Sequence, residues 1–197
     1  MKDYHHYIVL AYTSVLGALA IVFGTILSNN VNHAYISPIC FSVGILIVIS
    51  FDLGLITRAV PGGQLTEECF IIGFVNLVTA ALAGFILSDM GNFPQDLACS
   101  LSGAVATGII IGLVSISNKV SSRYSVLITM ILMFSFVYLK LPHCVVYAFY
   151  CGAARVVYGS SNWFNLCVVT IGNIVGGMII RFFYLTLSKK KVPKYEL

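Results

Sequence analysis

The sequence predicts an all-α membrane protein with six transmembrane helices, arranged as two inverted three-helix repeats whose second and fifth helices are broken. Two observations indicate this class. Of the 197 residues, 59% are hydrophobic and 9% are charged, whereas about 25% charged residues is usual in a soluble domain. Long apolar stretches also follow one another without a polar linker, which predicts one transmembrane domain over residues 1–197.

The composition excludes several other classes of protein. The 13% of aromatic residues argues against disorder. A net charge of +4 does not indicate nucleic-acid binding, because five of the eleven basic residues flank the last apolar stretch: Arg181, Lys189, Lys190, Lys191 and Lys194. The six cysteines lie in or against apolar runs, at spacings that match no metal motif. We therefore expect no enzyme, no cofactor, no metal site and no nucleic-acid partner.

Four stretches approach or exceed the roughly 20 apolar residues that an unbroken transmembrane helix needs. In chain order they are Tyr7–Leu27, Cys69–Leu87, Leu97–Ser117 and Trp163–Ile180, the last continuing past Arg181 to Leu187. Two more stretches are apolar but interrupted by ionisable and helix-breaking residues. Ile36–Phe51 resumes beyond Asp52 as Leu53–Thr57, and Tyr124–Leu139 resumes beyond Lys140, Pro142 and His143 as Cys144–Ala154.

The positions of the interrupted spans predict an internal repeat. They are the second and fifth of six, so each is the middle helix of a three-helix half, at about 7–88 and about 96–188. Because three is odd, the second half must run inverted relative to the first. Asn76 and Asn173, in the third and sixth spans, each precede small residues three and four positions later, which supports the repeat. Broken helices at corresponding positions predict a transport site near the bilayer midplane.

The basic residues predict the orientation in the lipid bilayer. The connections after the first and third spans contain no Lys or Arg, and the connection after the fifth has only Arg155. Lys2, Arg58, Lys119, Arg123 and the C-terminal cluster lie on the other side. We therefore expect an integral protein of the cytoplasmic membrane with both termini cytoplasmic.

Three segments carry a resemblance to a known family. The sixth span contains Asn165-Leu166, Val169-Thr170, Gly172-Asn173 and Gly176-Gly177 at the spacing N-L-x-x-V-T-x-G-N-x-x-G-G, which closely resembles the last helix of the formate/nitrite transporters. Residues 41–48 with 55–57, and residues 136–143, resemble that family's second and fifth helices. The resemblance implies an aquaporin-like architecture, a homo-pentamer, and a pore in each protomer for small monovalent anions such as formate, nitrite or hydrosulfide.

The resemblance also implies the pore residues. His143 and Thr57 become the central pair, Phe41 and Phe136 one apolar constriction, and Ile45, Leu55 and Ile56 the other. An imidazole changes charge near physiological pH, so His143 could lend a proton to a weak-acid anion. We interpret Asn76, Asn165 and Asn173 as structural residues that bond broken backbone.

Asp52 and Lys140 replace two glycines of the family pattern, and Arg58 follows Thr57 where the family has glycine. An ionisable group at the bilayer centre costs about 2.5–3.5 kcal/mol. One hypothesis is therefore an Asp52–Lys140 ion pair that bridges the broken helices. Another is that Lys140 points into the pore as an anion attractant, and a third is that both residues reach an interface.

The function itself has alternatives at this stage. The predicted function is a channel or proton-coupled transporter for small monovalent anions. A pore for a neutral solute or a cation on the same fold, a membrane anchor or haem-bearing subunit, and a non-conducting relative remain open. Bis-histidine haem ligation would need a second histidine facing His143 on another span, and the apolar stretches offer none.

Overall fold

The computed structural model describes the chain except residues 1–3, 65, 91, 92, 94–98, 121–123 and 190–197. All regular secondary structure in the described part is helical. In chain order the helices are α1 (Tyr4–Asn30), α2 (Ile36–Ser50), α3 (Ile56–Gly62), α4 (Thr66–Ile86), the 3-10 turn η1 (Ser88–Met90), α5 (Leu101–Val120), α6 (Ser125–Tyr138), α7 (Cys144–Tyr158) and α8 (Trp163–Lys189).

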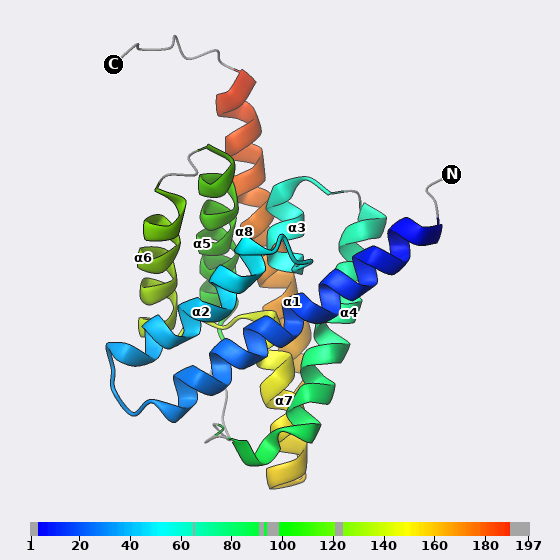
Figure 1. Ribbon diagram of the computed structural model, residues 1–197, viewed down its shortest axis with the longest axis vertical. Coiled ribbons are helices and arrows are strands. Elements are labelled where there is room, and N and C mark those ends of the chain that lie inside the picture. The colour runs from blue at the N-terminus through cyan, green and yellow to red at the C-terminus, as the bar shows by residue number, and fades with distance from the viewer. Residues whose placement is uncertain (1–3, 65, 91–92, 94–98, 121–123, 190–197) are drawn as a thin grey trace.

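The eight α-helices make the six predicted spans. By length and composition α1, α4 and residues 163–188 of α8 can each cross a membrane. The short apolar helices occur in consecutive pairs, α2 with α3 and α6 with α7, and each pair forms one broken span. The start of α1 and the ends of α5 and α8 lie toward one end of the molecule, and the α1–α2 connection and the end of α7 toward the other (Figure 1). Large apolar side chains such as Phe74, Phe164 and Phe182 are exposed on its surface, as the fold of a membrane protein requires.

The third span is shorter at its start than the sequence suggests. Residues 97 and 98 lie outside the described part, and Cys99 and Ser100 precede the helix. The hydroxyl of Ser100 accepts the N–H of Gly103 at 3.0 Å, which is the arrangement of a serine that caps a helix N-terminus. Helix α5 therefore begins at Leu101 and not at Leu97.

Small residues let the first and last helices of the second repeat approach closely. A Cβ added to Gly108 of α5 would lie 2.1 Å from the carbonyl oxygen of Asn173 in α8, and one added to Gly176 would lie 2.2 Å from that of Val105. Both positions therefore require glycine. The contact is within one protomer, between α5 and α8, and this tight packing holds the sixth span against the break between α6 and α7.

Both broken spans stop in the same way. At the end of α2, the N–H groups of Asp52 and Leu53 donate to the carbonyl oxygens of Ile49 (3.3 Å) and Val48 (2.9 Å). At the end of α6, those of Lys140 and Leu141 donate to Val137 (2.9 Å) and Phe136 (3.2 Å). This is the Schellman motif, in which the residue after the C-cap has a positive φ and is usually glycine. Asp52 has φ 49° and Lys140 has φ 53°.

The two ionisable residues therefore occupy equivalent positions, one at each break. A lysine in this left-handed region costs about 1–2 kcal/mol relative to a right-handed conformation, because its Cβ approaches the following carbonyl oxygen. Asp52 has a short polar side chain that tolerates the region better. Lys140 is thus a strained residue that the rest of the fold holds in place.

We expect Lys140→Gly to raise the melting temperature of the detergent-purified protein, because glycine adopts a positive φ without that steric cost. The gain should be about 1 kcal/mol, and differential scanning fluorimetry would measure it. Lys140→Ala is the control, since it removes the ammonium group and keeps the Cβ. Equal gains in both variants would assign the cost to the charge and not to the backbone.

Candidate functional site: a buried histidine between two cavities

Asn76 and Asn173 hold the two breaks with the same three hydrogen bonds. Asn76 Oδ1 accepts the N–H of Ile56 at 2.9 Å, and its Nδ2 donates to the carbonyl oxygens of Ser14 (2.7 Å) and Gly54 (3.0 Å). Asn173 Oδ1 accepts the N–H of Cys144 at 2.9 Å, and its Nδ2 donates to Ala104 (2.9 Å) and Pro142 (3.1 Å). Each amide thus caps the second half-helix of a break and ties that break to the first helix of the same repeat.

Asn165, the third asparagine of the sequence prediction, serves a different place. It lies at the start of α8, where its backbone N–H donates to Asn162 Oδ1 at 3.2 Å. It lies at neither break. In the sequence, Asn165 and Asn173 belong to the same motif, and nothing in that motif distinguishes the residue at a break from the residue at the start of the helix.

The structure brings His143 and Thr57 together. His143 is the last residue before α7 and Thr57 is the second residue of α3, and the distance between His143 Nε2 and Thr57 Oγ1 is 3.3 Å. The imidazole is only 2% exposed, and its Nδ1 is buried without a hydrogen-bond partner in the described part of the chain. An unused polar atom at such a place is available to a ligand that reaches it.

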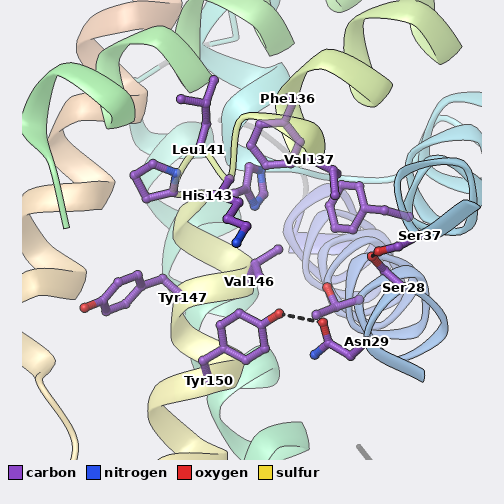
Figure 2. A pocket seen from close by; sticks show the side chains of 14 residues that line it. Ser28, Asn29, Ser37, Phe136, Val137, Leu141, His143, Val146, Tyr147 and Tyr150 are labelled. Atoms are coloured by element: carbon purple, nitrogen blue, oxygen red, sulfur yellow. Dashed lines mark hydrogen bonds between the residues drawn. The ribbon is translucent and has the colours of Figure 1, made fainter. Parts of the chain in front are cut away.

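A cavity of about 560 Å³ reaches His143 from the side where α1 ends, and we call it the His143 cavity. It lies among α1, α2, α6 and α7 and combines apolar rings with hydroxyl, amide and ammonium groups. Figure 2 shows the ring of His143 beside Phe136, and on another side of the cavity Tyr150 donating to Asn29. Its lining residues are Thr25, Ser28, Asn29, Ser37, Phe41, Phe136, Val137, Lys140, Leu141, Pro142, His143, Val146, Tyr147 and Tyr150.

A second cavity, of about 440 Å³, lies where α1 begins, and we call it the Arg58 cavity. Its wall comes from the first turns of α1, the break between α2 and α3, helix α3 with the following Gln64, and Ser115 of α5. Its charged and titratable residues are His6, Asp52 and Arg58. His6 is engaged elsewhere, because its Nε2 lies 2.9 Å from the carboxylate of Glu68.

The histidine–threonine contact lies between the two cavities. Helix α1 lines the Arg58 cavity as far as Thr13 and the His143 cavity from Thr25 onward, a separation of about 18 Å along the helix. Thr57 lies between Leu55 and Arg58, which line the Arg58 cavity, while His143 lines the other.

The predicted constriction residues lie at different places relative to the two cavities. Phe41 and Phe136 both line the His143 cavity, with ring centroids 5.5 Å apart, and Phe136 meets the ring of His143 edge to face at 6.1 Å. Leu55 lines the Arg58 cavity and Ile45 is buried. Ile56 instead packs against α4, where its Cδ1 would lie 3.2 Å from a Cβ on Gly73.

The expected ion pair between Asp52 and Lys140 is wrong. Asp52 Oδ1 lies 3.1 Å from Arg58 Nη2 and lines the Arg58 cavity, while Lys140 is exposed and lines the His143 cavity. The error came from placing both residues in mid-span. As caps of half-helices in inverted repeats, they point toward opposite ends of the molecule.

Sequence reasoning also missed functional candidates. From the sequence, Arg58 was used for the orientation and as a departure from the family pattern. That an arginine six residues after Asp52, beyond a break, could be the partner of that carboxylate was not recognised. Tyr150 and Asn29 come from different repeats, and their 3.0 Å hydrogen bond has no local signal in the sequence.

Comparison with solved structures identifies channels with the same fold. The fold matches a solved structure described as a pentameric formate channel with formate bound, with a TM-score of 0.68 and 17% identity over 94% of this chain and 97% of that one. It also matches a channel described as an ion channel of the formate/nitrite transporter (FNT) family, with a TM-score of 0.66 and 16% identity over 92% and 89% of the two chains. No protein-family model and no curated protein matches the sequence. The predicted resemblance is thus confirmed at the level of the fold.

We expect Asn76→Leu and Asn173→Leu to lower the melting temperature and the yield of folded protein severely. Each removes three hydrogen bonds and strands buried backbone groups, at about 1–3 kcal/mol for each unsatisfied group. Asn165→Leu should lower both quantities less, because it removes one side-chain hydrogen bond, with Tyr147 of α7, and leaves both breaks bonded. Similar melting temperatures for all three variants, measured in detergent, would mean that other contacts hold the breaks.

Proposed function

We propose that this protein is a channel or proton-coupled transporter for small monovalent anions of the formate, nitrite or hydrosulfide class. The observation that carries the proposal is the His143–Thr57 contact between two cavities, in a fold shared with formate/nitrite channels. A solute that crosses the protomer would meet an imidazole and a hydroxyl at its most buried point. The solved formate channel supports anions of this size as the substrate class.

The charges along the path favour an anion over a cation. Lys140 lines the His143 cavity, and Arg58 lines the other. Asp52, the acidic residue that made a cation pore conceivable, forms an ion pair with Arg58. Neither cavity therefore has a carboxylate free of a basic partner among its lining residues, and an entering cation finds no unpaired acid.

His143 supplies a way across the apolar constriction. An anion taken from water into apolar surroundings pays a desolvation cost that no single contact returns. If the imidazole lends a proton to a weak-acid anion, the neutral acid passes Phe41 and Phe136, and the histidine recovers a proton from the other side. Thr57 Oγ1, at 3.3 Å from Nε2, orients the ring during that exchange.

We further propose that the protein is a homo-pentamer in the cytoplasmic membrane, with both termini cytoplasmic. The solved formate channel of the same fold is pentameric. Apolar side chains exposed on α1, α4 and α8 would face lipid or neighbouring protomers. The start of α1 and the end of α8 lie toward one end of the molecule (Figure 1), which supports the common side that the basic residues predict.

Flux into proteoliposomes would test the function. We expect uptake of formate, nitrite and hydrosulfide, exclusion of chloride, and uptake that rises as the pH is lowered across a series. His143→Ala should reduce uptake by about a hundredfold or more, the lower end of what a positioned proton donor contributes to such a transfer. Thr57→Val should reduce it less, because it removes the hydroxyl and keeps the ring.

The control for that experiment is His33→Ala, which removes an exposed histidine outside both cavities. Anion uptake that ignores both pH and His143 would refute the protonation route and point to Lys140 as an electrostatic element of the pore. Absence of uptake for every anion tested would refute the proposed function.

Assembly and orientation have a test of their own. Native mass spectrometry of the detergent-purified protein should give five times the protomer mass of 21.4 kDa. A C-terminal tag should resist protease added to intact spheroplasts and be cut after lysis. A stable species of another size, or cleavage before lysis, would contradict the corresponding part of the proposal.

A further inference from the structure

Arg58 is anchored to the backbone of the first break. Its Nη1 donates to the carbonyl oxygens of Val48 at 3.0 Å and Leu53 at 3.3 Å. These bonds hold the guanidinium at the wall of the Arg58 cavity, and its side chain is only 19% exposed. Neither bond involves Asp52, so the position of the cation does not depend on that carboxylate.

Asp52 is held much more loosely than its partner. Its side chain is 93% exposed, and Oδ1 meets Arg58 through Nη2 alone at 3.1 Å. A strong guanidinium–carboxylate pair uses two parallel N–H donors, but here Arg58 Nε is buried and has no acceptor in the described part of the chain. Exposed ion pairs with a single contact contribute little, so another anion can compete for this donor.

The second break shows that the ion pair is not needed to form such a break. The equivalent of Asp52 there is Lys140, with the same positive φ. The equivalent of Arg58, the third residue of the following helix, is Val146. Those two side chains cannot form an ion pair, yet the same backbone hydrogen bonds close both breaks. The Asp52–Arg58 pair is therefore free to serve another role.

We propose that Arg58 is an anion-binding site in the Arg58 cavity and that Asp52 is its built-in competitor. The inference rests on the proposed function and specifies how an anion enters from this side. A small monovalent anion offers Nη2 the same charge and acceptor atoms as the Asp52 carboxylate. An anion entering here must displace an acid that belongs to the chain. The competition therefore lowers the rate of uptake at low anion concentration and has little effect on it at high anion concentration.

Asp52→Asn is the discriminating variant, because asparagine has nearly the same size and tolerates a positive φ. In proteoliposomes, the formate concentration for half-maximal uptake should fall by roughly threefold to fivefold, the factor expected when a weak, solvated ion pair stops competing. Maximal uptake should change little. Arg58→Gln should raise that concentration, and in the double variant Asp52→Asn should lose its effect.

Glu67→Gln is the matched control. It removes a carboxylate from the first turn of α4, near the same end of α1, where Glu67 accepts a hydrogen bond from Tyr7 at 3.4 Å and does not line the cavity. An unchanged half-maximal concentration in Asp52→Asn would overturn the proposal. An equal fall in Glu67→Gln would overturn it as well, because general surface charge would then be the cause.

A binding measurement separates this proposal from the proposed function. Sodium formate should raise the melting temperature of detergent-purified Asp52→Asn more than that of the unaltered protein, with sodium sulfate at equal ionic strength as the reference. This measurement needs no transport, and it does not depend on Arg58→Gln being able to fold. If formate raises the melting temperature of Asp52→Asn more but no variant transports anions, the proposed function alone is refuted. If formate raises both melting temperatures equally, the anion site is refuted.

Discussion

A helix that stops inside a membrane protein leaves backbone N–H and C=O groups without water to bind, and this constraint organises the whole structure. Each half of the chain meets it with one asparagine. Asn76 and Asn173 supply an acceptor to the first N–H of the second half-helix and two donors to carbonyl oxygens around the break. The close packing of α5 against α8 holds Asn173 near its break, and the extended residues Leu55 and His143 lead the chain into each second half-helix. Without these amides, buried backbone groups at both breaks would be left unpaired, at about 1–3 kcal/mol for each group.

The repeated scaffold carries different chemistry in its two halves. The residue that precedes the second half-helix is Leu55 in the first repeat and His143 in the second. The cap residue with positive φ is acidic in the first repeat and basic in the second. Because the halves are inverted, these differences face opposite ends of the molecule. The imidazole and Lys140 therefore border one cavity, and the Asp52–Arg58 pair borders the other. A symmetrical backbone thus carries two cavities with unlike charged and titratable residues.

Much of the architecture was predictable because it depends on local sequence and on the bilayer. Six spans, the two breaks and the inverted repeat follow from where apolar stretches begin, end and are interrupted. The His143–Thr57 contact was predicted from the resemblance of three helices to one family. The start of α5 was misplaced because apolarity continues upstream of Leu101, whereas the helix begins where Ser100 can cap it. Ile56 was assigned to the pore by its motif position, but its side chain packs against Gly73 of α4.

The sequence by itself determined what each segment is: apolar enough to be buried in lipid, interrupted at two places, and supplied with asparagines that can bond free backbone. These properties depend on residues that are neighbours in the chain, so they can be recognised from the sequence without the fold. The tertiary structure alone decided which ionisable groups meet. Asp52 pairs with Arg58 and not with Lys140, because inversion of the repeats sends equivalent caps to opposite ends. Charges are matched by distance in space, and that distance is set only when both halves have packed against each other.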